Sequence, residues 1–467
     1  MTRRMRAASM SLAVRCRKGS HVLTIGVAIA TAAACFDPAA AHAQSSVRPG
    51  TFSVRGEDVS AEYGELEVRA NRASGTDAVL TLRFVRFAST AAEPRPPIVF
   101  LAGGPGDAAT RALSGMPREV LEQLRAVADV IAFDQRGTGT SEPSDPTCGA
   151  SPMLPRDRAG DAEHLLSILR PFVAACIAAA PSRGIDIGGL TTVESADDVE
   201  ALRQALGAPS LQLLAGSYGT HLALAVARRH PESVTAMVLA GVEGPDHTFK
   251  RPVLADSVLA GIAAAKRPTL LQEIATLRAR LMEPVAYTFA NGRTITLGAW
   301  DLQRWVAESL DAMPEIAAMM SAMPRLLDGD YEPLAVWTLR ARLPQPFNLM
   351  NLAMDCASYA SDERLRLIGN EGRTALLGDA LNFPKPALCD LSGLPRLDDT
   401  FRQPVSSNTS ALLVTGEWDG RTPPANAREV ARRMPNAHVL VIENASHGVL
   451  GHPDVLRRSI ELFRGAK

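Results

Sequence analysis

Ser217 lies at a position in the sequence pattern where a nucleophile would be exposed. Ser217 follows an apolar run at residues 211–214 and precedes apolar residues at helical spacing, so we expect a strand, a sharp turn and a helix. The turn reads Ala215-Gly216-Ser217-Tyr218-Gly219. Small residues on both sides of the serine are typical of a nucleophile elbow, because its backbone is strained and its helix packs closely on the strand. Ala215 replaces the usual glycine with the next smallest residue. The alternative interpretation is a strand–helix unit with an unremarkable serine.

A serine hydroxyl needs a base within hydrogen-bond reach and a third group that orients this base. Among the histidines after residue 43, only His447 lies in a loop just beyond a strand near the C-terminus. We therefore interpret His447 as the base. His452 is the alternative, although Pro453 beside it indicates the start of a helix.

Asp419 is the predicted orienting acid, because it lies in the turn after the apolar run 411–415. Glu417 is expected to point elsewhere. Glu243 and Asp246, after the preceding strand, are the alternative acids, and a solvated turn residue is the alternative interpretation of Asp419. The resulting order of serine, aspartate and histidine along the chain is the order expected for an α/β-hydrolase fold.

A glycine-rich loop follows the apolar run 98–102. It reads Gly-Gly-Pro-Gly at residues 103–106, and such a loop can turn its N–H groups into a cavity as one half of an oxyanion hole. A plain strand-to-helix turn is the alternative. Another loop holds Asp134 and Arg136 at a strand end, and we expect this charged pair to brace neighbouring turns and not to take part in chemistry.

The elements that position these residues form an alternating series. Residues 64–69 and 78–87 alternate between apolar and polar side chains, which predicts half-buried antiparallel strands. Continuous apolar runs, typical of strands buried on both faces, follow at residues 98–102, 127–133, 211–215, 234–240, 411–415 and 438–442. Helical patterns separate most of these runs. The sequence therefore predicts the α/β class, with a mostly parallel, doubly wound sheet.

The alternation stops between about residues 245 and 404. Helical patterns dominate this stretch, together with one hairpin signal at Asn291-Gly292. We interpret it as an inserted, mainly helical lid. The predicted organisation is a signal peptide (1–43), a first part of the core (44–245), the lid (246–404) and a second part of the core (405–467).

The N-terminus is typical of a signal peptide. Six basic residues precede the apolar stretch 22–34, and Ala41-His42-Ala43 forms a small-x-small cleavage site. We therefore predict export to the periplasm or the outside. An uncleaved anchor and lipid attachment at Cys35 are alternatives. No later segment reaches the roughly 20 apolar residues that a membrane span needs, so we expect no stable span in the mature chain.

The composition is that of a globular protein, with 467 residues, 46% hydrophobic and 21% charged. Beyond residue 43 the chain has 43 basic and 49 acidic residues, a net charge of −6. A mildly acidic body argues against nucleic acid as a partner. We expect a small molecule or a short peptide as the substrate, while the sequence leaves the oligomeric state open.

Four cysteines remain after the predicted cleavage: Cys148, Cys176, Cys356 and Cys389. In an oxidising compartment they suggest two disulfides, with three connectivities to choose from. We favour the local pairs Cys148–Cys176 and Cys356–Cys389, because each closes a loop of modest length. The spacing fits no zinc pattern, and we expect neither a metal nor a cofactor.

Taken together, the motifs resemble those of α/β-hydrolases of the prolyl aminopeptidase and tripeptidyl aminopeptidase-like group. The resemblance covers most of residues 50–465, weakly in the lid. It rests on residues 103–106, 134–139 and 216–220, and on Gly416, Asp419, Thr422 and Pro423. The resemblance implies a triad of Ser217, Asp419 and His447, with the backbone N–H groups of Gly104 and Tyr218 holding the oxyanion.

The chain departs from this group in two respects. Ala102 stands where prolyl aminopeptidases usually have histidine. The lid shows no clear pair of glutamates for the free amino terminus of a substrate. Asp355 and Glu363 lie near Cys356, but nothing in the sequence shows that they face the site.

We predict an exported serine hydrolase that works through an acyl-enzyme and releases N-terminal residues or short peptides. A carboxylesterase or other acyl hydrolase is the alternative, because the same triad serves esters. Dehalogenases and epoxide hydrolases use aspartate at the elbow, where this chain has Ser217. A non-catalytic binding protein on the same fold is a more remote alternative.

Overall fold

The computed structural model describes residues 46–465, all within the compact unit His42–Lys467. The predicted signal peptide, its cleavage site and Cys35 lie outside the described residues. Export and lipid attachment therefore stay predictions.

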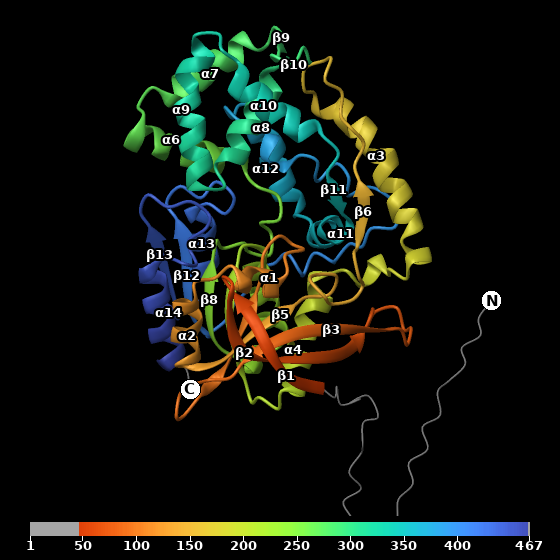
Figure 1. The fold of residues 1–467 in the computed structure, drawn as a ribbon, viewed down its shortest axis with the longest axis vertical. Coiled ribbons are helices and arrows are strands. Elements are labelled where there is room, and N and C mark those ends of the chain that lie inside the picture. The colour runs from red at the N-terminus through yellow and green to blue at the C-terminus, as the bar shows by residue number, and fades with distance from the viewer. Residues whose placement is uncertain (1–45, 466–467) are drawn as a thin grey trace, which may run out of the picture. The chain divides into compact units, whose positions relative to one another are not determined.

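A nine-stranded sheet forms the centre of this unit (Figure 1). Its strand order is β1-β2-β3-β5-β4-β7-β8-β12-β13. The strands are β1 (Ser46–Val54), β2 (Glu57–Arg69), β3 (Val79–Phe87), β4 (Arg95–Leu101), β5 (Ala128–Asp134), β7 (Leu211–Gly216), β8 (Val234–Ala240), β12 (Ser410–Gly416) and β13 (Ala437–Ile442). Strands β1 to β3 pair antiparallel, as does β3 with β5, and the others are parallel. The predicted fold class is confirmed.

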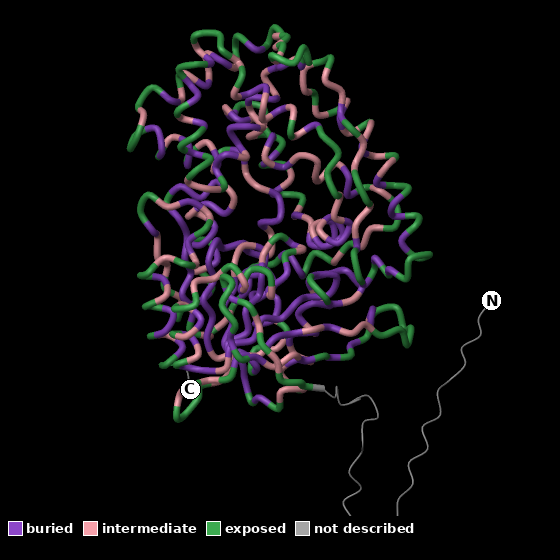
Figure 2. The backbone as a smooth tube through the Cα atoms, in the orientation of Figure 1, coloured by how far each residue is buried: buried purple, intermediate pink, exposed green. Residues whose placement is uncertain are grey.

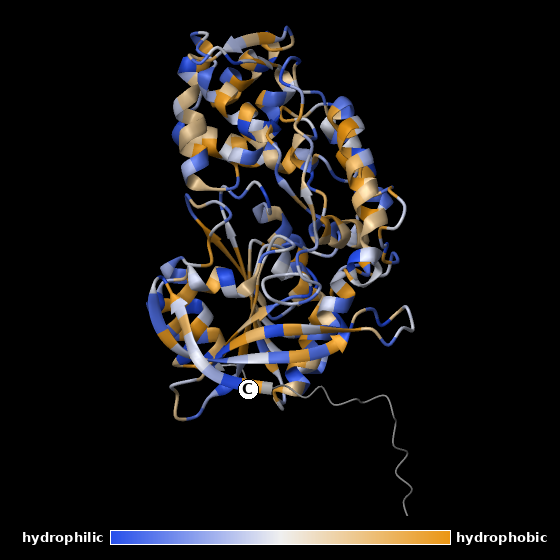
Figure 3. Cartoon of the chain, turned by 45° about the vertical axis from the view of Figure 1, so that its right-hand side comes forward, coloured by the Kyte–Doolittle hydropathy of each residue, from blue (hydrophilic) through white to orange (hydrophobic). Residues whose placement is uncertain are grey.

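Apolar side chains of the parallel strands point to both faces of the sheet, as expected for a sheet covered on both sides. On β7, Leu213 belongs to one apolar cluster together with Leu222 of α5, whereas Leu214 belongs to a second cluster that contains Phe463 of α14. Figures 2 and 3 show the central strands as buried and hydrophobic. The helices outside the insertion are α1 (Ala109–Ser114), α2 (Arg118–Arg125), α3 (Ala162–Ala179), α4 (Thr192–Ala205), α5 (Tyr218–Arg229), α13 (Pro424–Ala431) and α14 (Pro453–Gly465).

Between β8 and β12 the chain is mainly helical, as predicted (Figure 1). Its helices are α6 (Pro252–Lys266), α7 (Leu270–Arg280), α8 (Ala299–Ser309), α9 (Met313–Leu327), α10 (Glu332–Arg342), α11 (Leu349–Ser358) and α12 (Asp362–Gly372). The hairpin at Asn291-Gly292 is confirmed, with strands β9 (Val285–Thr288) and β10 (Thr294–Leu297). Strand β11 (Pro346–Asn348) pairs with β6 (Thr147–Ala150). The four domain boundaries stay a prediction.

The insertion has its own apolar cluster, which is continued by one residue of the core. Ile262, Leu277, Trp305 and Met323 belong to this cluster, as does Trp418 from the loop after β12. Trp418 is 1% exposed. Because Trp418 is the neighbour of Asp419, packing of the lid helps to fix the loop that carries the predicted acid.

Both favoured disulfides are present. Cys148 pairs with Cys176, and Cys356 pairs with Cys389. Within the described range, α3 is the one helix long and apolar enough to cross a membrane. Its disulfide to β6 and its buried residues, such as Leu165 and Val173, tie α3 to the folded unit.

Asp134 and Arg136 both stabilise the fold, but the predicted ion pair between them is wrong. Asp134 accepts hydrogen bonds from the N–H and hydroxyl of Thr110, at 3.0 and 2.8 Å. The fully buried guanidinium of Arg136 donates to Asp198 at 2.8 Å and to the carbonyl of Ala70 at 2.7 Å. Each side chain thus joins its loop to a different segment.

Candidate active site

Ser217 occupies a strained turn between β7 and α5. Strand β7 ends at Gly216, α5 begins at Tyr218, and Ser217 has φ +54° and ψ −127°. Positive φ is unfavourable for a side chain other than glycine and persists only where the surroundings enforce it. Two hydrogen bonds of 2.8 Å hold Ser217 in this conformation. They run from the Ser217 N–H to the Ala240 carbonyl and from the Thr220 N–H to the Ser217 carbonyl.

The small residues of the motif allow this close packing. A Cβ atom at position 219 would lie 2.2 Å from the carbonyl oxygen of Leu101, so only glycine fits there. Ala215 is fully buried and pairs with Leu101 on one side and Leu239 on the other. A Cβ atom at position 103 would lie 2.9 Å from Cβ of Ser217. Gly103 therefore lets the glycine-rich loop approach the serine.

The two proposed oxyanion donors are both unpaired in the described part of the chain. Gly104 has φ +104°, and neither its N–H nor that of Tyr218 donates a hydrogen bond to a described residue. Tyr218 is the first residue of α5, where helix N–H groups lack partners within the helix. Both groups are thus free to bind a developing negative charge.

Asp419 and His447 form a hydrogen-bonded pair in which the aspartate is buried and the histidine partly exposed. Nδ1 of His447 lies 2.9 Å from Oδ2 of Asp419, and Asp419 is fully buried. The Thr422 hydroxyl donates to the same oxygen at 2.6 Å and lies 3.1 Å from Nδ1 of His447. The other oxygen accepts from the N–H groups of Arg421 and Thr422, at 2.9 and 2.7 Å. The carboxylate is therefore held in one orientation.

Electrostatics favour the charged form of both partners. Burial alone would lower the pKa of His447, but the charge and hydrogen bond of the Asp419 carboxylate, together with the charge of Asp311, outweigh burial and raise the pKa above its ordinary 6.5. Burial would likewise raise the pKa of Asp419, but His447 and the hydrogen bonds from Thr422 hold it below 3.8. The pair is thus suited to an imidazolium that forms during proton transfer.

The alternative acids bind other partners. Glu243 accepts from Nζ of Lys250 at 2.5 Å, and Asp246 accepts from the N–H and hydroxyl of Ser361, both at 2.6 Å. Glu417 accepts from the N–H of Asn444 at 3.0 Å. None of the three contacts a histidine that faces Ser217.

The alternative base also lies elsewhere. Nδ1 of His452 accepts from the N–H of Asp454 at 3.3 Å. His452 directly precedes α14, as Pro453 indicated.

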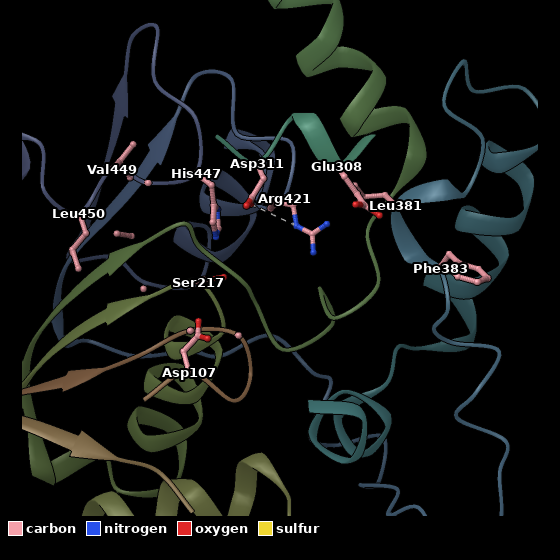
Figure 4. Close-up of a pocket in the computed structure, with 15 residues that line it drawn as sticks. Asp107, Ser217, Glu308, Asp311, Leu381, Phe383, Arg421, His447, Val449 and Leu450 are labelled. Atoms are coloured by element: carbon pink, nitrogen blue, oxygen red, sulfur yellow. Dashed lines mark ion pairs between the residues drawn. The ribbon is translucent and has the colours of Figure 1, made fainter. Parts of the chain in front are cut away.

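Ser217 and His447 line one cavity of about 650 Å³ (Figure 4). Figure 4 shows the His447 ring over Ser217, and Asp107 on the opposite side of the serine. Arg421 extends into the same space, with its Nε atom 3.9 Å from Oδ1 of Asp311. This larger cavity therefore gives a substrate access to both the predicted nucleophile and the predicted base.

A smaller cavity of about 280 Å³ lies on another side of Ser217. It is lined by Ser217, Gly104, Glu243 and Asp355, and not by His447. Glu363 does not reach it, since Glu363 is exposed and lines a separate cavity beside His247.

Two lysines also line the smaller cavity, and the sequence did not point to them. They are Lys250, which pairs with Glu243, and Lys385, which pairs with Asp355. Both lysines lie in irregular segments of the lid, between β8 and α6 and after α12. No local pattern connects such segments to the elbow.

The lid contacts each loop of the site. The Asn351 side chain in α11 donates to the carbonyl of Pro105 at 2.7 Å. In the turn after α8, the carbonyl of Leu310 accepts a hydrogen bond from the N–H of Gly420 at 3.2 Å. The carbonyl of Asp311 accepts from the N–H of His447 at 3.3 Å. Lid and catalytic loops are thus positioned together.

Residues 96–451 match the family described as the alpha/beta hydrolase fold. Serine protease Hip1 of Mycobacterium tuberculosis is 29% identical over 191 residues, which cover 39% of this chain and 36% of Hip1. Proline iminopeptidase of Xylella fastidiosa is 27% identical over 193 residues, 38% of this chain and 45% of that protein. The chain thus spans about a third to a half of these two relatives. The putative hydrolase YuaR of Escherichia coli is 26% identical over 382 residues, 75% of this chain and 73% of YuaR.

The family match covers well over half of the chain and includes all five predicted site residues. The relatives named as a serine protease and as a proline iminopeptidase agree with the peptidase-like group that the motifs resemble. The chain therefore belongs to the α/β-hydrolase family.

Proposed function

We propose that the protein is an exported serine peptidase that releases N-terminal residues or short peptides through an acyl-enzyme. The observation that carries this proposal is the larger cavity, which Ser217 and His447 line together, with Nδ1 of His447 2.9 Å from Oδ2 of Asp419. A nucleophile, a base and an orienting acid are the three groups that acyl transfer needs.

The proposed reaction has two steps. Oγ of Ser217 attacks the scissile carbonyl while its proton passes to Nε2 of His447. The C–N bond then breaks, and the departing amine takes that proton. In the second step a water attacks the acyl-enzyme, with His447 again accepting and returning one proton. The N–H groups of Gly104 and Tyr218 hold the oxyanion, each worth roughly 3 kcal/mol.

The two cavities suggest how the substrate lies. His447 must protonate the leaving group, and His447 lines only the larger cavity, so the leaving peptide belongs there. The acyl part then occupies the smaller cavity, where Glu243 and Asp355 each keep one carboxylate oxygen that accepts from no described residue and could bind an ammonium group. A small polar cavity beside the nucleophile supports an enzyme that acts at a free amino terminus.

The second candidate is a carboxylesterase. The larger cavity has apolar side chains, namely Leu381, Phe383, Val449 and Leu450, that suit an alcohol leaving group. The test is a panel of aminoacyl and peptidyl anilides, with free and acetylated amino termini, alongside short acyl esters. We expect the highest kcat/KM on anilides with a free amino terminus. A preference for acetylated anilides or for esters would contradict the peptidase proposal.

Export rests on the N-terminal pattern and on the two disulfides, which are typical of proteins that fold in an oxidising compartment. Sequencing the N-terminus of the protein made in its own host tests it. We expect the mature chain to begin at Gln44. A chain that keeps residues 1–43 and is found in the cytoplasm would contradict export.

A further inference from the structure

Each carboxylate of the smaller cavity is paired with a lysine through one of its two oxygens. Oε2 of Glu243 accepts from Nζ of Lys250 at 2.5 Å, and Oδ2 of Asp355 accepts from Nζ of Lys385. The two acids are 7% and 13% exposed, and the two lysines 13% and 21%. Both ion pairs are thus largely withdrawn from solvent while they line a cavity that contains the nucleophile.

The placement of these lysines stands out in this chain. Only five of its 49 basic residues are lysines, and three of the five lie in the described range. Two of those three line this one cavity. A lysine ammonium is a compact charge with three donors, whereas the arginine guanidinium is a planar group that binds a carboxylate through two parallel hydrogen bonds.

The charges of the cavity do not suit an ammonium alone. Glu243 and Asp355 are paired with Lys250 and Lys385, and the third cation of the lining, Arg421, lies 3.9 Å from Asp311. An added ammonium would therefore give the cavity an excess of positive charge, which is unfavourable at a site partly withdrawn from solvent. A residue that carries both an ammonium and a carboxylate would leave the balance unchanged.

Both signs of charge have hydrogen-bonding capacity left. Nζ of Lys250 also donates to the His247 carbonyl at 3.1 Å, and Nζ of Lys385 to Oδ1 of Asn351 at 2.7 Å. Each ammonium has three protons, so one per lysine is unused by the described residues. The second oxygen of each carboxylate likewise accepts from no described residue. Two donors and two acceptors thus remain for a ligand.

We propose that Lys250 and Lys385 make the enzyme select peptides whose N-terminal residue has an acidic side chain. The α-ammonium donates to the free oxygens of Glu243 and Asp355, and the side-chain carboxylate accepts from the two lysines. A cavity of about 280 Å³ lies at the small end of ligand sites and suits one such residue. This inference rests on the proposed aminopeptidase function and adds the class of residue that is released.

Glutamyl and glutaminyl anilides test the inference directly, because their acyl groups have the same shape and differ in one charge. We expect the wild-type enzyme to favour the glutamyl anilide by about tenfold or more in kcat/KM, because the neutral glutamine amide brings no carboxylate to offset the charge of the substrate's ammonium group. Equal rates on both substrates, or a preference for the glutaminyl anilide, would overturn the inference.

The lysines are tested by Lys250→Met and Lys385→Met. Each variant should lower the ratio of glutamyl to glutaminyl turnover several-fold, while Lys266→Met should keep the wild-type ratio. Lys266 is exposed and lies over the Trp418 ring at 5.2 Å, outside both cavities. A wild-type ratio in both cavity variants would overturn the inference.

Removing one lysine leaves a buried carboxylate uncompensated and can prevent folding. The double variant Lys385→Met with Asp355→Asn removes the pair without that charge. This double variant should fold and should still hydrolyse the glutaminyl anilide, because Glu243 remains to bind the ammonium group. It should lose most of the preference for the glutamyl anilide. An unchanged preference in the double variant would contradict the role of Lys385.

The two proposals fail in different ways. Turnover of glutaminyl and alanyl anilides without any glutamyl preference would overturn only the acidic specificity. No turnover on any anilide with a free amino terminus, together with turnover of esters, would overturn the aminopeptidase function and the specificity with it.

Discussion

Nδ1 of His447 lies 2.9 Å from a carboxylate oxygen of Asp419 that has no exposed surface. A carboxylate in this position fixes the tautomer of the imidazole and stabilises its protonated form. We therefore expect Asp419→Asn to reduce kcat by about 10⁴-fold with little change in the fold. Steady-state kinetics and circular dichroism check this result. Glu417→Gln is the matched control, because Glu417 is two residues away and binds Asn444. An unaffected rate in Asp419→Asn would contradict this role of Asp419.

The pH profile follows from the same pair. His447 acts as a base only when neutral, and its pKa is raised above 6.5 because Asp419, together with the charge of Asp311, outweighs the effect of burial. We expect kcat/KM to fall as the pH drops through an inflection above 6.5. Removing the carboxylate charge in Asp419→Asn should move the inflection of the residual activity to lower pH. A wild-type inflection well below 6.5 would contradict this assignment of the base.

Asn351 connects the lid with the oxyanion loop. Its amide donates to the carbonyl of Pro105 at 2.7 Å, next to the proposed oxyanion donor Gly104. We expect Asn351→Leu to lower kcat by about tenfold with a smaller change in KM, because misplacing one donor weakens transition-state binding. Asn370→Leu, on the exposed side of α12, is the control. A change in KM alone would assign Asn351 to substrate binding.

The two disulfides should differ in their effect on activity. By the loop-entropy model, replacing either pair with serines should lower the free energy of unfolding by roughly 3–4 kcal/mol, as denaturant titration would show. Cys356 follows Asp355 in α11, and Cys389 lies shortly after Lys385, so this bridge holds the wall of the smaller cavity. Loss of Cys356–Cys389 should therefore lower kcat/KM at least severalfold more than loss of Cys148–Cys176. Equal losses of activity would contradict this difference.

Much of the site could be predicted because its parts follow local rules. Ser217, Asp419 and His447 each follow an apolar run, and parallel strands bring their carboxyl ends to one edge of the sheet. The backbone itself requires small residues around Ser217, because a Cβ atom at position 219 would lie 2.2 Å from the carbonyl oxygen of Leu101. The structure brings Asp419 and His447 into contact, and Ser217 lines the same cavity as His447.

The charged partners could not be predicted, because they depend on contacts far apart in the sequence. Arg136 binds Asp198, 62 residues further on, and not its neighbour Asp134. Asp355 and Glu363 looked equivalent in the sequence, but only Asp355 faces the site. Lys385 reaches Asp355 across 30 residues of irregular chain and helix, where no periodicity fixes the direction of a side chain.

The most direct test of the proposed mechanism is Ser217→Ala, measured with the best anilide of the panel and with a serine-reactive fluorophosphonate. We predict that the wild-type enzyme is labelled at Ser217 and loses its activity. The variant should fold normally, remain unlabelled and lose roughly 10⁶-fold in kcat. A folded Ser217→Ala variant that turns the substrate over at the wild-type rate would contradict the account.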